Sequence, residues 1–249
     1  MKKLKIIQLL FVFIKQCFII HRVKFAIKVE KGMNIKAVCF DMDGVIVDTM
    51  RHHVEAWRHA FNENGYDHEE LVFYLREGMP GKNTIKDVFE YSNVDVNKEM
   101  IEDIYVQKRD YFKKHAQYDF IEETVSTLKA LSKEQIPIAV VTGSRKEFVF
   151  EVLSKLPVTF DIIVTGDDVK EGKPSPEPYL LAMERYSFKP SEWLVIENAP
   201  LGIQSAKGAG AYCLAIETTL DEKYLKEADQ IIRPKDLLHS VRNLIKGME

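Results

Sequence analysis

The stretch that decides the fold reads Ile35-Lys36-Ala37-Val38-Cys39-Phe40-Asp41-Met42-Asp43-Gly44-Val45-Ile46-Val47-Asp48-Thr49. Its first part is short and apolar, which is typical of a buried strand, and it ends at acidic residues. Asp41 and Asp43 can face one cavity if the chain leaves strand geometry there, and Gly44 permits that departure. Two close carboxylates repel each other, so the pair favours a bound cation, and Mg²⁺ prefers oxygen ligands.

Four further apolar runs occur along the chain, at 137–141, 160–164, 193–196 and 211–216. Helix-like stretches lie between or after them, at about 122–134, 145–156, 176–186, 201–208 and 236–246. Apolar strands that alternate with helices predict an α/β fold with a parallel sheet covered on both faces. Polar residues follow strand after strand, and that edge is where open α/β sheets bind ligands.

One segment breaks this alternation. Residues 50–118 have helical patterning and no convincing buried strand, most clearly at 51–64, 84–91 and 98–114. An all-helical insertion directly after the first strand predicts a cap over the strand ends. We therefore expect a core made of 34–49 and 119–249, with 50–118 as the cap. Asp48 and Thr49 are the expected N-cap residues of the first cap helix.

Composition excludes several function classes. The chain has 249 residues, of which 46% are hydrophobic and 29% charged, as in ordinary globular proteins. Its net charge of -3 gives no global attraction to nucleic acid or to an anionic membrane, so we expect no nucleic-acid partner. Three scattered cysteines are too few for a disulfide framework. A reducing cytoplasm is the expected compartment.

Residues 1–33 form an N-terminal extension before the first strand. It has a basic start and an apolar run at 6–14, which Lys15 and Gln16 interrupt. A bilayer span needs about 20 apolar residues, and this stretch falls short. Three interpretations stay open: translation that begins at Met33, a membrane-associating anchor, and a cleaved signal that lacks a clear cleavage site. Apart from such an anchor, we expect no membrane association.

Four motifs occur in order at predicted strand ends, namely Asp41–Val45, Val141–Ser144, Gly172–Tyr179 and Ile196–Gly202. Together they resemble the four motifs of the haloacid dehalogenase (HAD) superfamily. The resemblance extends from residue 34 almost to the C-terminus, and Gly172–Tyr179 is the stretch least expected by chance. The helical insertion is similar to the cap of the β-phosphoglucomutase and phosphoglycolate phosphatase-like branch. A HAD-like Rossmannoid fold and a phosphoryl-transfer activity are therefore implied.

The resemblance assigns roles to the acidic pair and to one lysine. Asp41 would attack phosphorus and form an aspartyl-phosphate. The Asp43 side chain would protonate the leaving oxygen and then activate the acceptor, which is water or a sugar hydroxyl. Lys173 would neutralise charge on Asp41 and on the phosphate, because a carboxylate that approaches a phosphate dianion is otherwise repelled.

The second motif supplies the expected phosphate-binding groups. Thr142 would hydrogen-bond the transferring phosphoryl group, and backbone N–H groups near Gly143 and Ser144 would assist it at the start of a helix. Arg145 follows directly, where its side chain reaches a substrate phosphate or is merely solvated. Taken singly, Thr142 is as ordinary as any turn hydroxyl, so its assignment depends on the ordered set of motifs.

The metal set contains one departure from the family's commonest pattern. The resemblance implies Mg²⁺ bound by Asp41 and by the backbone carbonyl of Asp43. The fourth motif usually carries two consecutive acids, but here Glu197 is followed by Asn198. Glu197 would then supply the acidic ligand, directly or through water, with the weaker amide oxygen of Asn198 beside it. The alternative is that Asn198 caps the next helix and that the site binds metal poorly.

Candidate substrate contacts lie in the cap. In the resembling mutases, the position equivalent to His53 helps to hold the acid/base loop, and a lysine matching Lys108 contacts substrate or phosphate. A simple packing role is the alternative for His53. The cap arginine that grips the distal phosphate in those mutases falls near Gly81, and the adjacent Lys82 lacks a bidentate fork.

Three functions follow from this sequence. The first is a Mg²⁺-dependent phosphatase that acts on a small phosphorylated metabolite, such as a sugar phosphate or phosphoglycolate. The second is a β-phosphoglucomutase-like phosphohexomutase, which must exclude water and pass phosphate to a second hydroxyl. The third is a phosphate-binding regulatory protein whose catalysis is impaired by Asn198. The mismatch near Gly81 weakens the second.

Overall fold

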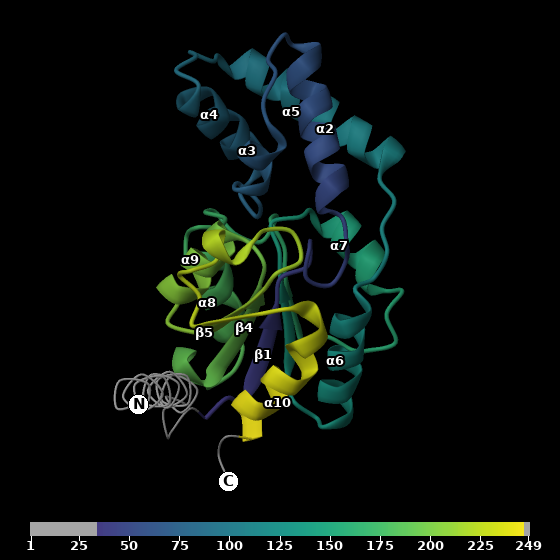
Figure 1. Cartoon of the computed structure of the whole chain (residues 1–249), viewed down its shortest axis with the longest axis vertical. Coiled ribbons are helices and arrows are strands. Elements are labelled where there is room, and N and C mark those ends of the chain that lie inside the picture. The colour runs from purple at the N-terminus through teal and green to yellow at the C-terminus, as the bar shows by residue number, and fades with distance from the viewer. Residues whose placement is uncertain (1–33, 247–249) are drawn as a thin grey trace, which may run out of the picture.

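The computed structural model describes residues 34–246 (Figure 1). The three interpretations of residues 1–33 therefore lie outside the described part of the chain. Within 34–246, no helix is long and apolar enough to cross a membrane.

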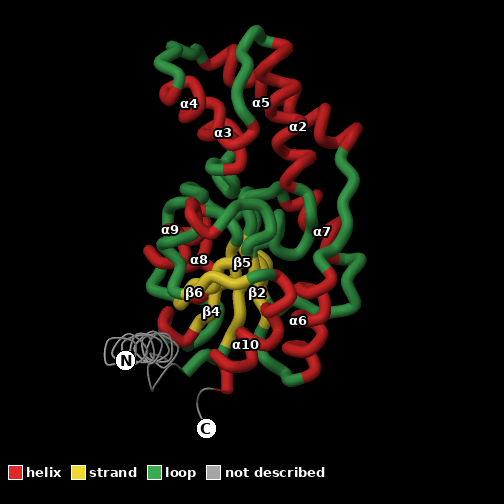
Figure 2. Tube along the Cα trace, in the orientation of Figure 1, coloured by secondary structure: helices red, strands yellow, loops and turns green. Residues whose placement is uncertain are grey.

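A six-stranded parallel sheet forms the centre of the core, in the order β3-β2-β1-β4-β5-β6 (Figure 2). The strands are β1 (Ala37–Phe40), β2 (Ile138–Val141), β3 (Ile162–Val164), β4 (Trp193–Glu197), β5 (Tyr212–Ile216) and β6 (Gln230–Ile232). The predicted parallel α/β sheet is thus confirmed, and each of the five apolar runs contains a strand. We did not predict β6, a three-residue edge strand in which only Ile232 is buried.

The two faces of the sheet follow the period-2 alternation of strand side chains. Val38 and Phe40 face a core cluster contributed by α6 (Glu122–Lys133), α7 (Lys146–Leu153) and α10 (Leu237–Lys246). Ala37 and Cys39 face the opposite cluster, contributed by α8 (Glu177–Met183) and α9 (Pro200–Gly208). Three short 3₁₀ turns complete the core, at Pro190–Glu192, Glu222–Tyr224 and Pro234–Asp236. Because both faces are covered, ligand access is left to the strand ends.

The helical insertion stands above the C-terminal ends of the strands (Figure 1). It consists of α2 (Met50–Glu63), α3 (Glu70–Tyr74), α4 (Gly81–Tyr91) and α5 (Lys98–His115). These helices bury their own aromatic cluster, which includes Trp57, Phe61, Phe73 and Phe89. The prediction of an all-helical cap after the first strand is confirmed. The cap boundaries of 50–118 stay a prediction, as do those of the core.

The α3–α4 loop, residues 75–80, brings the cap into contact with the core. A Cβ atom on Gly143 would lie 2.7 Å from the carbonyl oxygen of Gly78. A Cβ atom on Gly172 would lie 2.5 Å from the Pro80 ring. Gly78 itself has φ +81°, a conformation that glycine adopts without steric cost. Two core glycines thus make room for the loop, which reaches the strand ends where the predicted motifs lie.

Candidate active site

The loop after β1 places Asp41 and Asp43 at the C-terminal edge of the sheet. The backbone N–H of Asp41 donates to Ile196 in the neighbouring strand at 3.0 Å. Gly44 turns the chain with φ +77°, and its N–H donates to the carbonyl of Val47 at 2.7 Å. A Cβ atom at Gly44 would overlap the side-chain amide of Asn198. Glycine is therefore required here both for its backbone conformation and for space.

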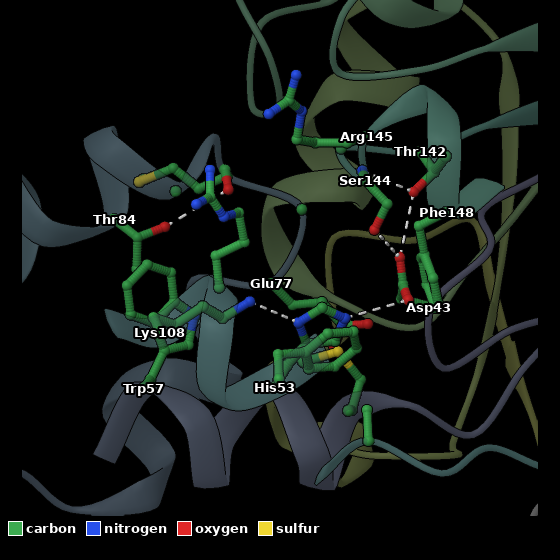
Figure 3. Close-up of a pocket in the computed structure, with 18 of the residues that line it drawn as sticks. Asp43, His53, Trp57, Glu77, Thr84, Lys108, Thr142, Ser144, Arg145 and Phe148 are labelled. Atoms are coloured by element: carbon green, nitrogen blue, oxygen red, sulfur yellow. Dashed lines mark hydrogen bonds and ion pairs between the residues drawn. The ribbon is translucent and has the colours of Figure 1, made fainter. Parts of the chain in front are cut away.

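Four side chains hold the Asp43 carboxylate, and Figure 3 shows three of them, His53, Thr142 and Ser144. Thr49 donates its hydroxyl to Oδ1 at 2.6 Å, and His53 Nε2 lies 3.3 Å from the same oxygen. Ser144 and Thr142 donate their hydroxyls to Oδ2 at 2.7 and 3.2 Å. Burial raises the pKa of Asp43, but His53 and the hydroxyl donors outweigh burial and bring the pKa below its usual range. Asp43 is thus oriented by residues of both core and cap.

Thr49 corrects one sequence-based prediction. We expected its side chain to cap α2, but the structure shows no side-chain cap hydrogen bond at that helix start. The hydroxyl instead donates to Asp43, and the residue is fully buried. Thr49 lies six residues after Asp43, at the start of α2. This short separation could have suggested a contact with Asp43, but we did not use it.

Lys173 joins the first, second and fourth motifs. Its ammonium donates to Asp41 Oδ1 at 2.5 Å, to Glu197 Oε1 at 2.6 Å and to the carbonyl of Val141 at 3.2 Å. Lys173 is 2% exposed. Burial lowers its pKa, but Asp41 and Glu197 outweigh burial and raise it above its usual range. Lys173 therefore carries its charge directly against an Asp41 oxygen.

Glu197 forms an ion pair with Lys173. Besides Lys173, it accepts a 2.6 Å hydrogen bond from the hydroxyl of Tyr179 and one from the backbone N–H of Asn198 at 3.0 Å. A Cβ atom on Gly202 would overlap its carboxylate, so the first turn of α9 also confines it. Glu197 is not among the residues that line the cavity described below. The structure thus surrounds the predicted acidic metal ligand with three hydrogen-bond donors. Lys173 and Asn198, like Glu197, are not among the lining residues.

Asn198 contacts a carboxylate that we did not predict. Its amide donates to Glu77 Oε1 at 2.8 Å and to the hydroxyl of Thr219 at 3.0 Å. Glu77 comes from the α3–α4 loop of the cap and is 6% exposed. Burial raises its pKa well above the usual range, and Asp41 raises it further. No sequence pattern marks Glu77, and only the missing second acid at Asn198 indicated a compensating carboxylate.

These residues fit a divalent cation in part. Within 34–246, no three His, Cys, Asp or Glu side chains are grouped as metal ligands. The Oδ1 atom of Asn198 is buried and has no hydrogen-bond partner among the described residues, so it is an unused oxygen donor. Burial raises the pKa of Asp41, Glu197 and Asp43 raise it further, and Lys173 opposes the shift. A cation beside Asp41 would lower that pKa and restore the carboxylate.

His53 connects the cap to Asp43. Its ring stacks on Phe112 at 4.0 Å between centroids, and its Nδ1 lies 2.8 Å from the Lys108 ammonium (Figure 3). Lys108 lies 5.0 Å above the Trp57 ring and 4.9 Å above the Phe112 ring. Burial lowers the pKa of Lys108 to about 8. The structure thus brings both predicted cap residues together, with His53 against Asp43 and Lys108 on the opposite side of the His53 ring.

Two other predicted substrate-binding residues lie further out. Arg145 lines the cavity, but its side chain is 61% exposed and pairs with Asp167 at 3.4 Å. Lys82 does not line the cavity and instead pairs with Glu102 at 2.5 Å on the cap surface. Arg76 does line it, although its guanidinium is held by Asp87 at 2.6 Å. Sequence reasoning missed Arg76 because nothing distinguishes it from a solvated helix-end arginine.

A cavity of about 500 Å³ lies between cap and core and joins these groups. Asp41, Asp43, Thr142, Gly143 and Ser144 line its core side. The cap side is lined by residues that include His53, Trp57, Glu77, Tyr105 and Lys108. The cavity is mixed in character, because aromatic rings lie beside charged groups. A small molecule fits its size, and Lys108 and Arg145 are cationic groups of the lining.

Comparisons with known proteins agree with this geometry. The profile of the haloacid dehalogenase-like hydrolases matches residues 38–216. The chain therefore belongs to the haloacid dehalogenase-like hydrolase family, as the four motifs predicted. A validoxylamine A 7'-phosphate phosphatase from Streptomyces hygroscopicus subsp. limoneus is 29% identical over 201 residues, which cover 80% of this chain and 93% of that protein.

Two further relatives extend the comparison. Pyrophosphatase PpaX from Bacillus mycoides is 30% identical over 224 residues, which cover 86% of this chain and 96% of that protein. A solved structure from Bacteroides vulgatus, described as a candidate β-phosphoglucomutase, is 34% identical with a TM-score of 0.80. That match covers 88% of this chain and 92% of the other. The relatives are thus phosphatases and phosphoglucomutase-like proteins.

Proposed function

We propose that this protein is a Mg²⁺-dependent phosphatase that hydrolyses a small phosphorylated metabolite through a phospho-Asp41 intermediate. The observation that carries the proposal is the 2.5 Å contact between Lys173 and an Asp41 oxygen, at the edge of a cavity that Asp43 also lines. Family membership supports the hydrolase class. The names of the relatives support a phosphate ester or anhydride as substrate.

Two steps complete the reaction. In the first, an Asp41 oxygen bonds to phosphorus as the bond from phosphorus to the leaving oxygen breaks, and Asp43 in its protonated form gives its proton to that oxygen. The donors around Asp43 keep its pKa low, so this protonated form is the minor one at neutral pH. In the second, water attacks phosphorus, Asp43 takes a proton from the water, and the bond to Asp41 breaks. Inorganic phosphate leaves, and both carboxyl groups return to their starting forms.

The surrounding residues offset charge and hold the acid/base group. Lys173 keeps a positive charge against Asp41 and so reduces its repulsion toward phosphate. Thr142 and Ser144, which contact Asp43, border the space in which the phosphoryl group would sit. Mg²⁺, when bound, would supply further charge neutralisation, and Asp41, the carbonyl of Asp43 and Asn198 Oδ1 are residues that would hold it.

Hydrolysis is favoured over the mutase alternative by the cap side of the cavity. A mutase needs a second phosphate subsite, and the arginine of the resembling mutases falls near Gly81. A Cβ atom at Gly81 would lie 2.6 Å from the Tyr105 ring, so Tyr105 occupies the space that a side chain there would need. Lys82 lies outside the cavity and Arg76 is held by Asp87.

The substrate and compartment are part of the same proposal. A sugar phosphate, phosphoglycolate or a compound of similar size suits a cavity of about 500 Å³. Cys39 and Cys213 are buried thiols without a disulfide, which supports a cytoplasmic site of action. The regulatory alternative would require the site to bind phosphate without turning over any ester.

A phosphatase panel with Mg²⁺ tests this function. We expect phosphate release by the wild type and nearly complete loss in Asp41→Asn, with retained circular dichroism. Asp48→Asn is the matched control, because Asp48 is an exposed carboxylate on the same loop. Acid quenching during turnover should trap phosphate on the wild type and none on Asp41→Asn. Equal turnover by the wild type and Asp41→Asn would refute the mechanism, and no turnover of any ester would favour the regulatory alternative.

A further inference from the structure

We propose that Glu77, a carboxylate of the cap, binds the divalent cation together with Asp41 and Asn198. The cation would then bridge the cap and the core. This inference rests on the proposed function, because it takes the cation to act at Asp41. Glu77 lies outside the four sequence motifs. It would serve as the acidic metal ligand in place of Glu197, which is hydrogen-bonded to Lys173.

The first observation is that Glu77 is a buried carboxylate without a cationic partner. It is 6% exposed, and no Lys, Arg or His side chain forms an ion pair with it in the described part of the chain. Its contacts are neutral donors, the amide of Asn198 at 2.8 Å and the hydroxyl of Thr219 at 3.5 Å. A buried carboxylate is costly unless a positive charge accompanies it. A bound cation supplies that charge.

The second observation is independent and concerns Asn198. This residue is completely buried, and its Oδ1 atom lacks a hydrogen-bond partner among residues 34–246. Amide and carboxylate oxygens are the donors that a hard divalent cation prefers. The amide group of Asn198 already touches Glu77, so both oxygens belong to one small region. A buried amide oxygen without a hydrogen-bond donor, beside a buried carboxylate without a cationic partner, is a set of donors that suits a divalent cation.

Charge balance favours the same assignment. Lys173 and Glu197 form an ion pair at 2.6 Å, so together they contribute no net charge. Asp43 lines the same cavity, but three hydroxyls and His53 hold its carboxylate, so Asp41 and Glu77 remain as the two other buried acidic side chains of the lining. A divalent cation balances them, whereas the motif residues alone would leave it with one side-chain carboxylate and one neutral amide. Glu77 thus replaces the acid that position 198 lacks.

The location of Glu77 gives the proposal a consequence for the cap. Glu77 lies in the α3–α4 loop, and the next residue, Gly78, packs against Lys173. A Cβ atom on Gly78 would lie 2.9 Å from the Lys173 side chain. A cation held by Glu77 and Asp41 can be fully coordinated only while this loop stays against the core. Cation affinity and closure of the cap are therefore linked, and each strengthens the other.

Calorimetric titration of the full chain with MgCl₂ tests the ligand assignment. We expect Glu77→Gln, which keeps the shape and the hydrogen-bond acceptor, to weaken Mg²⁺ binding about 10- to 100-fold. Glu63→Gln, which removes an exposed cap carboxylate on α2, should leave the dissociation constant unchanged. Asn198→Asp should tighten binding, and it should restore affinity when combined with Glu77→Gln. Unchanged Mg²⁺ affinity in Glu77→Gln, or no restoration in the double variant, would overturn the proposal.

Hydrogen exchange measures the link to the cap. We expect Mg²⁺ to slow amide exchange across residues 75–80 in the wild type and to have no such effect in Glu77→Gln. A purely structural role for Glu77 predicts equal exchange changes in both proteins, which would contradict the cation link. These results can be told apart from a failure of the proposed function. If Glu77→Gln binds Mg²⁺ normally and Asp41→Asn is inactive, only the assignment of Glu77 as a ligand is rejected. A wild type that binds no Mg²⁺ rejects the inference and the metal dependence together.

Discussion

Tyr179 offers the sharpest test of how the Lys173–Glu197 pair is held. Its ring is fully buried under the sheet, and its hydroxyl donates a 2.6 Å hydrogen bond to Glu197. Lys173 lies 5.1 Å from the ring centroid. The substitution Tyr179→Phe removes only the hydroxyl, so the ring packing and the contact with Lys173 remain. The measured change therefore isolates one hydrogen bond to a buried carboxylate.

The expected magnitude follows from the kind of bond that is lost. A hydrogen bond to a charged group contributes about 1.5–3 kcal/mol, and Glu197 would keep only Lys173 and the backbone N–H of Asn198 as donors. For a chain of this size, that loss lowers the melting temperature by about 3–12 °C. The matched control is Tyr186→Phe, whose hydroxyl donates to Asp161 at 3.1 Å on the exposed surface. Surface substitutions usually change stability by no more than about 0.5 kcal/mol.

The pH dependence of the Tyr179 effect has a defined sign. Burial raises the pKa of Tyr179 well above its usual range, and Glu197 and Asp41 raise it further. A raised folded-state pKa gives stability that is complete below the unfolded value and is lost only above it. The difference between wild type and Tyr179→Phe should stay constant from about pH 6 to pH 9 and decrease above about pH 10. Equal melting shifts for Tyr179→Phe and Tyr186→Phe would refute the reasoning.

Two further predictions concern glycine packing and a buried lysine. Gly202→Ala should lower the melting temperature, because the added Cβ atom would displace Glu197. Gly208→Ala in the same helix is the control: its Cβ atom would lie 3.4 Å from Pro176, an ordinary contact, so this variant should be neutral or more stable. Thermal melts of both variants test the prediction. Lys108→Met should raise stability at pH 7 by about 1–3 kcal/mol while reducing turnover, because the lowered pKa of about 8 means that burial of the charged form is unfavourable. The gain should disappear as pH approaches 10.5, where the unfolded lysine also loses its proton, and a gain that persists there would contradict the argument.

The sheet could be predicted because its strands are buried on both faces. Each of the five apolar runs has at least three consecutive apolar residues, and polar residues mark where each one ends. The edge strand β6 lacks this signal, since two of its three residues are only partly buried. Helix α3 escaped prediction for a similar reason: it has five residues, of which only Phe73 is buried. Short elements with one anchoring side chain leave no periodic pattern to detect.

Residues close in sequence were easier to assign than residues that meet only through the fold. Asp41 and Asp43 are two positions apart, and their motif alone indicated shared chemistry. Thr49 looked like a helix cap because its local sequence position suits one, and only the folded loop directs its hydroxyl to Asp43. Glu77 lies 121 positions from Asn198, and no local pattern connects them. Its assignment needed the cap to be placed on the core.

The replacement of an acid by Asn198 therefore has a different meaning in the structure from its meaning in the sequence. By itself, an amide where an acid is usual indicates a weakened metal site and a loss of catalysis. Because Asn198 contacts Glu77, the amide instead indicates that the second acidic ligand is supplied by the cap and not by the core. The total charge available to a cation is then preserved, but part of it now depends on the position of the α3–α4 loop. Such a site would be expected to bind its cation only in the closed arrangement, which a core-only metal site does not require.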